Sequence, residues 1–403
     1  MLWRMQPRLN SISEKLIAHA CGLPVDARFF DALSPAEWRL ARAVSWSQGI
    51  TGLLHVRIQD DLFGPAAWRD YLAAQYASNR ARVDRMLSLL ERILDEMSAR
   101  GIAPMPLKGM DLITRVYDDA ALRPIGDIDL LVRPQDMAAA GEAVLASGFT
   151  AEGGIKRHDV FVLPPNTVAE FLSEHPDNPI KVELHPAIAG RIARLDYDLT
   201  ERMWRGATEE SWRGRRIMRS DIVALQLHLL VHAASDMHPR LLRAVRMHDA
   251  HLVYSRMTDA HMCQLLDEAS AANGAWWAFA PSALTARYYP GSPPRWLMDA
   301  LRTRTHASLR WLIGRATATS MSACNVRRTS PVEFAAWAQS PAQALKHAAT
   351  IFVPTREDRE TWQLKSTAPG TSKGWRRHLG RLRHALNGKA VRAQSEMLFK
   401  LVD

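Results

Sequence analysis

Residues 123–132 read Arg-Pro-Ile-Gly-Asp-Ile-Asp-Leu-Leu-Val, a short apolar run interrupted by two acidic residues. In a β-strand, residues two apart project from the same face, so Asp127 and Asp129 would lie together while Ile128 faces the core. Two carboxylates this close repel each other, and a divalent cation is the usual way in which proteins balance them. Gly126, directly before the pair, allows a bend or the close approach of a ligand.

A third carboxylate stands in a second strand-like segment, Val182-Glu183-Leu184-His185. Glu183 and His185 would share one face of that strand. Together with the aspartate pair, Glu183 would complete a two-metal site for phosphoryl transfer. Upstream, Lys108-Gly109 lies between a short strand and a helix, where backbone amides and an ammonium group could hold phosphates.

The motifs lie in a region of alternating short elements, which is typical of an α/β or α+β domain. A helix is expected at 133–147, and the proline-broken segment 164–179 is expected to be a loop. Four apolar segments are predicted strands: 102–107, 128–132, 161–163 and 180–184.

Both flanks of this region are expected to be helical. Ser34 to Glu37 has the form of a capping box, with proline in the first turn. A long apolar stripe runs from Pro65 to about Arg100, where Gly101 ends it. Further helices are predicted after the cap residue Asp221 and at 241–256, 261–272, 296–315 and 331–349.

The net charge of +10 is concentrated at one end of the 403-residue chain. Residues 301–403 hold 18 basic and 6 acidic residues, so residues 1–300 are nearly neutral. On a helix, residues 371–393 would place an apolar stripe opposite several arginines. Such a segment could bind an anionic membrane surface, a nucleic acid or an acidic partner, or it could be a docking helix or a solvated tail.

The three cysteines, Cys21, Cys263 and Cys324, are far apart and form no CxxC pair. This argues against a disulfide framework or a thiolate zinc site. The sequence shows no signal-peptide pattern and no apolar run long enough to span a bilayer, so a cytoplasmic location is expected.

Several of these motifs together resemble the uncharacterised nucleotidyltransferase family of the polymerase-β-like superfamily. The resemblance is carried by LKG, a following tyrosine, RPIGDIDLLV and VELH. It continues in the segments Leu227–His232, Arg240–Asp249 and Ile351–Pro354, and it covers roughly residues 100–360.

The resemblance implies an α+β protein with a polymerase-β-like core in a small mixed sheet. Asp127, Asp129 and Glu183 would be the catalytic metal ligands, for Mg²⁺ or Mn²⁺, with an NTP as co-substrate. Arg123 would face a phosphate, or pair with an aspartate. The Gly-Ser turn of the superfamily is absent, and Lys108-Gly109 stands in its place. His185 would lie beside the metal, and Gly126 would border the nucleotide.

The expected organisation has four parts: an N-terminal helical region (1–100), the nucleotidyltransferase core (101–190), a C-terminal helical domain (191–360) and a basic tail (361–403). His228 and His232 have a spacing that can hold zinc, but a packing or hydrogen-bonding role is favoured because no third ligand is indicated.

The predicted reaction moves a nucleotidyl group from an NTP to a hydroxyl of a small molecule or peptide. The enzyme would then be a tailoring enzyme of a natural-product, capsule or modified-peptide pathway. Two alternatives remain open. One is a toxin-like nucleotidyltransferase that acts on tRNA, with the basic tail on the RNA backbone. The other is a non-catalytic nucleotide-binding scaffold.

Overall fold

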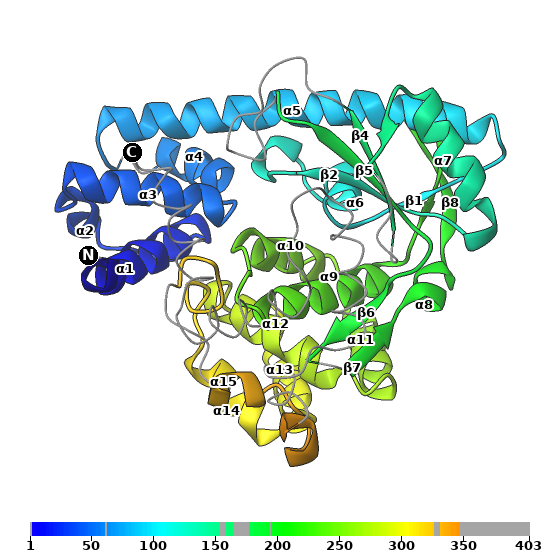
Figure 1. The fold of residues 1–403 in the computed structure, drawn as a ribbon. Coiled ribbons are helices and arrows are strands. Elements are labelled where there is room, and N and C mark those ends of the chain that lie inside the picture. The colour runs from blue at the N-terminus through cyan, green and yellow to red at the C-terminus, as the bar shows by residue number, and fades with distance from the viewer. Residues whose placement is uncertain are drawn as a thin grey trace, which may run out of the picture.

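The computed structural model describes residues 2–60, 63–152, 158–163, 177–193, 195–325 and 331–345. Within these ranges helices dominate and the strands form small sheets, so the protein is of mixed α and β structure (Figure 1). At this level the predicted α+β class is confirmed.

Helices alone build the part of the chain before the first strand: α1 (Leu2–Ala20), α2 (Ala27–Asp31), α3 (Pro35–Ser47), α4 (Thr51–Asp60) and α5 (Ala66–Ser98). The capping box predicted for α3 is present. The Ser34 hydroxyl accepts a hydrogen bond from the Glu37 amide, and the Glu37 carboxylate accepts one from the Ser34 amide. Gly101 follows α5 with a positive φ of 74°, a conformation that costs glycine little.

The central sheet has five strands in the order β1-β2-β5-β4-β3. Their bounds are β1 (Met105–Pro106), β2 (Asp127–Leu131), β3 (Thr150–Ala151), β4 (Asp159–Leu163) and β5 (Ile180–His185). Only the pair β2–β5 is parallel, and its register places Asp129 beside Glu183. Between the strands lie α6 (Lys108–Arg115), η1 (Ala120–Leu122), η2 (Pro134–Asp136) and α7 (Met137–Ala146).

The helix α5 spans the full width of the molecule in Figure 1 and contacts both the N-terminal helices and the sheet region. Its first part, with Trp68 and Leu72, packs in the core of the N- and C-terminal helices. Its second part packs against the sheet face that carries Ile128 and Leu130. The inward direction predicted for Ile128 is therefore confirmed.

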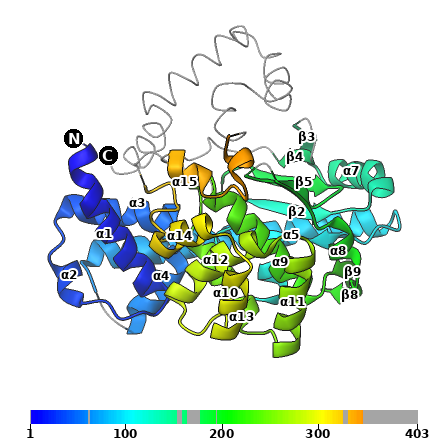
Figure 2. The ribbon, with the colours of Figure 1, turned by 90° about the horizontal axis from the view of Figure 1, so that it is seen from below.

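After the sheet the chain forms two hairpins and a second set of helices. These are β6 (Ala189–Ile192), β7 (Leu195–Asp198), α8 (Thr200–Trp204), β8 (Thr208–Trp212), β9 (Arg215–Arg219), α9 (Ile222–Met237), α10 (Val245–Tyr254), α11 (Asp259–Ala271), α12 (Ala275–Tyr288), α13 (Arg295–Thr303), α14 (Ala307–Arg315) and α15 (Pro331–Ala335). Figures 1 and 2 place this helical set between the N-terminal helices and the sheet.

Three sequence expectations need adjustment. The chain after the core is expected to be helical from about residue 196, but it first forms the hairpins β6–β7 and β8–β9. The helix predicted at 296–315 is two helices, α13 and α14, because the chain turns between Thr303 and Ala307. In the described part of the helix predicted at 331–349, α15 is followed by a break at 336–340 and by further helical residues at 341–345. The loop residues 164–176, the segment 351–354 and the basic tail 361–403 lie outside the described residues. In the part of the chain that the structure describes, every helix is too short or too polar to cross a bilayer.

Candidate active site

The predicted acidic residues meet where β2 and β5 run side by side. Parallel pairing aligns Asp129 with Glu183 and Leu131 with His185. Asp127 and Asp129 stand two apart on β2, and Glu183 and His185 stand two apart on β5, so each pair shares a face. The opposite face is buried against α5 and α7. Strand periodicity thus directs the polar side chains of both strands to the same side of the sheet.

Two side chains contact one carboxylate oxygen of Asp129, and Glu183 and His158 lie next to them. The Lys108 ammonium nitrogen lies 2.6 Å from Oδ1 of Asp129, and Nε2 of His185 lies 2.8 Å from the same oxygen. Oε2 of Glu183 lies 3.4 Å from Nε2 of His185 and 3.9 Å from the ammonium nitrogen. His158, the residue directly before β4, approaches Glu183 to 3.7 Å.

Asp129, Glu183 and His185 could together hold a metal ion. One ligand atom from each lies within 4.8 Å of the other two, and among the described residues this is the one such group of His, Cys, Asp and Glu side chains. Two carboxylates with one imidazole suit a divalent cation of intermediate hardness, such as Mn²⁺, as well as Mg²⁺. Asp127, also a predicted ligand, is not part of this group.

The two aspartates of β2 have opposite electrostatic environments. Burial and the charge of Asp129 raise the pKa of Asp127 to about 7. Burial also opposes ionisation of Asp129, but Lys108 and His185 outweigh it and hold the pKa of Asp129 well below its usual range. The repulsion predicted for the pair therefore falls mainly on Asp127, the carboxylate that Lys108 does not touch.

Lys108 owes its position to the start of α6. It is the first residue of that helix and has a φ of +49°, in the left-handed region that a non-glycine residue seldom adopts. The Leu107 amide donates to the backbone oxygen of Asp129, which fixes the turn against β2. Although burial opposes its charge, the pKa of Lys108 is raised by Asp129 and Asp127. The ammonium group therefore stays charged within the acidic cluster.

The two predicted glycines have different surroundings. A Cβ on Gly109 would lie 2.3 Å from a guanidinium nitrogen of Arg123, so only glycine fits there. A Cβ on Gly126 would meet no atom within 4 Å. The chain beside Asp127 is therefore open, which suits the predicted approach of a ligand to Gly126. The roles of both glycines toward phosphate stay predictions.

Arg123 is held by a partner from the C-terminal helices. Its Nε and Nη2 donate to the two carboxylate oxygens of Asp249 on α10, each at 2.9 Å, and the Tyr117 hydroxyl donates to Asp249 at 2.7 Å. Arg123 and Asp249 are 6% and 1% exposed. This buried pair joins the loop before β2 to α10. It gives Arg123 a structural partner, as one of the two sequence interpretations expected, although the partner is not one of the strand aspartates. The predicted phosphate contact stays a prediction.

Sequence reasoning missed Arg82, His158 and the partnership of Tyr117 with Asp249. Arg82, on α5, is fully buried and donates to the carbonyl oxygens of Ile125 at 2.9 Å and Gly126 at 2.8 Å. A charged residue within the long apolar stripe of α5 was the available signal, since such a residue is seldom buried without partners.

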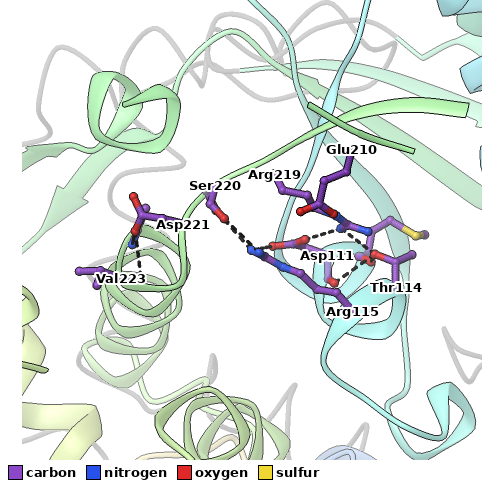
Figure 3. A network of polar contacts seen from close by, with 10 residues as sticks. Asp111, Thr114, Arg115, Glu210, Arg219, Ser220, Asp221 and Val223 are labelled. Atoms are coloured by element: carbon purple, nitrogen blue, oxygen red, sulfur yellow. Dashed lines mark hydrogen bonds and ion pairs between the residues drawn. The ribbon is translucent and has the colours of Figure 1, made fainter. Parts of the chain in front are cut away.

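A second polar network holds α6 in place (Figure 3). Asp111 accepts hydrogen bonds from Arg115 at 2.7 Å and from Arg219 at 2.5 Å. Arg115 also donates to the backbone oxygen of Ser220 at 3.0 Å. Because Ser220 directly precedes Asp221, the cap of α9, this network ties the helix that carries Lys108 to the start of α9.

A small mixed sheet carries acidic residues on adjacent strands, next to a helix start with a lysine, and this arrangement suits phosphoryl transfer. The family comparison makes this more specific. Residues 34–289 match the model of the uncharacterised nucleotidyltransferase family, and the chain belongs to that family. The match begins earlier than the resemblance noted from the motifs and ends before residues 351–354.

Among solved structures, the chain is similar to one from a study entitled "Solution Structure of Antibiotic-Resistance Factor ANT(2'')-Ia Reveals Substrate-Regulated Conformation Dynamics". The identity is 14%, with 47% of this chain and 92% of the other covered, and the TM-score is 0.34. No curated protein matches the chain. The family assignment therefore rests on the family model.

Proposed function

We propose that this nucleotidyltransferase moves a nucleotidyl group from an NTP to a hydroxyl of a small-molecule or peptide acceptor, in a polymerase-β-like core. The observation that carries the proposal is the convergence of Asp129, Glu183 and His185 around one point, next to Lys108. Family membership supports the reaction class. A tailoring role in a natural-product, capsule or modified-peptide pathway would suit such an acceptor.

The residues present fit Mg²⁺ or Mn²⁺. Asp129 and Glu183 would bind the ion, with Asp127 as a further carboxylate once its proton is lost and His185 beside them. When bound, a divalent ion neutralises phosphate charge and lowers the pKa of the attacking hydroxyl. Asp127 is the carboxylate poised to give up its proton near neutral pH, because its pKa is about 7.

The other site residues would orient the nucleotide. Lys108 brings a positive charge to the acidic cluster, where it would attract the triphosphate. The open space over Gly126 would admit the phosphates close to the backbone. The Arg123–Asp249 pair would keep the loop before β2 in place while the nucleotide binds.

The test is a screen of the four NTPs, each labelled at the α-phosphate, with Mg²⁺ or Mn²⁺ and a small-molecule cell extract as the source of acceptor. We expect a labelled product and pyrophosphate for at least one NTP. Both should disappear in the double variant Asp127→Asn, Asp129→Asn. A matched control is Asp118→Asn, because Asp118 is fully exposed. Undiminished transfer by the double variant would overturn the proposal.

The same preparation separates the two alternatives. A nucleotide-binding scaffold would bind an NTP when titrated in a calorimeter, but it would release no pyrophosphate and label no product. An enzyme that acts on tRNA would label tRNA in place of a small molecule. Its RNA binding would weaken steeply with salt and would be lost when residues 371–403 are removed.

A further inference from the structure

The helix α9 carries a row of three polar side chains on a largely apolar surface. Twelve of its residues are buried, and most of them are aliphatic. His228, His232 and Asp236 follow each other at intervals of four, so they lie on one face of the helix. The imidazole rings of the two histidines are nearly parallel, with centroids 6.4 Å apart.

This row lies within electrostatic reach of the catalytic cluster. Burial is the main cause that lowers the pKa of His228 and of His232, and the charge of Lys108 lowers both further while Asp129 opposes it. The charge of Lys108 acts on Asp236 as well. The network around Asp111 fixes α6 against the start of α9, so this placement belongs to the fold (Figure 3).

The row includes one hydrogen-bonding group that the described protein leaves unused. His228 is 4% exposed, and its Nδ1 has no hydrogen-bond partner among the described residues. A buried polar atom without a partner costs roughly 1–3 kcal/mol, a cost that a bound ligand can remove. His232 and Asp236 are desolvated by the surrounding protein, yet the side chain of each remains 22% exposed.

The geometry argues against a zinc site on this row. Ligands of one zinc ion converge, with their donor atoms about 2 Å from the metal. Here the rings stack side by side, and the three side chains do not form a compact ligand group in the described part of the chain. The packing or hydrogen-bonding role expected for His228 and His232 is thus favoured.

We propose that His228, His232 and Asp236 form the wall that binds the acceptor, and that the acceptor is a neutral polyhydroxylated molecule such as a sugar. This inference rests on the proposed nucleotidyl transfer. A neutral imidazole offers one donor and one acceptor, which is what a hydroxyl group needs. Asp236 is already balanced by Arg246, whose Nε lies 2.5 Å from its carboxylate. A polyamine would therefore find no free carboxylate on this wall.

The experiment uses ligand-observed saturation-transfer NMR on the full-length protein, with and without Mg²⁺ and a nucleotide analogue bridged by α,β-methylene. The probes are a panel of neutral sugars and inositols, together with kanamycin as a polycationic probe. We expect transfer to at least one neutral probe. The signal should fall at least about fivefold in His228→Leu and in His232→Leu, as the loss of one or two hydrogen bonds predicts.

His251→Leu is the matched control. His251 is a partly buried histidine on α10, stacked on Tyr289 with centroids 4.1 Å apart, and burial alone shifts its pKa. Its variant should keep the signal. If a leucine variant fails to fold, as its melting curve would show, His228→Gln and His232→Gln replace it, because glutamine stays polar but cannot reproduce both ring nitrogens.

The inference is overturned if no neutral probe gives a signal, if kanamycin alone does, or if the signal survives both histidine substitutions. Calorimetric titration of Mg²⁺ and NTP into the same preparations separates this failure from failure of the proposed function. Intact NTP binding with an unchanged probe signal overturns the acceptor wall alone. Absent NTP binding in the wild type overturns the nucleotidyl transfer.

Discussion

The ammonium nitrogen of Lys108 lies 2.6 Å from Oδ1 of Asp129, so the chain supplies a cation of its own to the acidic cluster. The ammonium group and a divalent ion would compete for the same carboxylate. Lys108 therefore reduces the net negative charge of the site that would bind the metal. Its backbone has a left-handed conformation, which lysine seldom adopts.

Lys108→Met is expected to bind Mn²⁺ more tightly, by about 5- to 30-fold, because it removes a charge worth roughly 1–2 kcal/mol. Nucleotidyl transfer should nevertheless fall by about 10²-fold, since the phosphates lose a positive charge. Titration of Mn²⁺ by electron paramagnetic resonance and a pyrophosphate assay measure the two effects. The control is Lys181→Met, because Lys181 pairs with Glu152 on the surface. Equal Mn²⁺ affinities for wild type and Lys108→Met would refute this competition.

Gly109→Ala is expected to destabilise the protein by about 2–4 kcal/mol, because the new Cβ would displace a buried guanidinium. Arg123 would have to move away from Asp249 to relieve a 2.3 Å contact. Urea unfolding measures the change. Gly126→Ala is the matched control and should stay within about 0.5 kcal/mol of the wild type, since its Cβ meets nothing. Similar stabilities for the two alanine variants would contradict the packing argument.

Arg82→Met is expected to cost about 3–5 kcal/mol, because it removes a buried group that bonds to several backbone oxygens. Arg82 donates to the chain before β2 and, at 3.3 Å and 3.4 Å, to the oxygens of Asn178 and Pro179 before β5. Hydrogen exchange should rise first at those strand starts. Arg80→Met tests an exposed arginine on the same helix and should cost less than about 1 kcal/mol. A small effect at both positions would argue against a clamping role.

The unfolding free energy should fall as the pH rises from 5 to 8 through Asp127. The carboxyl titrates near 3.8 when unfolded and near 7 when folded, so the folded protein holds the extra proton in between. Stability is then lost as that proton is removed. In the presence of a metal chelator, the unfolding free energy of the wild type should fall by on the order of 1–3 kcal/mol more than that of Asp127→Asn between pH 5 and 8. Urea titrations at both pH values check this, and parallel losses would exclude the raised pKa.

The alternation of side chains along a strand was sufficient to predict which carboxylates share a face, since this period of two residues depends only on local backbone geometry. It placed Asp127 with Asp129 and Glu183 with His185 on shared faces, and the strand register then brought the two pairs together. The family could also be recognised from these motifs.

The partners of the basic residues could not be predicted in this way. Lys108 and Asp129 are 21 residues apart, and Arg123 and Asp249 are 126 apart. Such contacts depend on how helices pack on the sheet, and many carboxylates in the sequence could serve equally well. The long apolar stripe of α5 predicted a helix, but it gave no indication that Arg82 binds the strand starts.

The 33-residue helix α5 also limits how the protein could have been assembled in evolution. At 1.5 Å per residue it is about 50 Å long, and this one helix contributes side chains to two hydrophobic cores. If recombination joined a fragment beginning near residue 100 to another protein, that fragment would contain the sheet but lack Arg82. A segment that keeps the whole of α5 with the sheet therefore has to begin before α5. The family match does begin earlier, at residue 34.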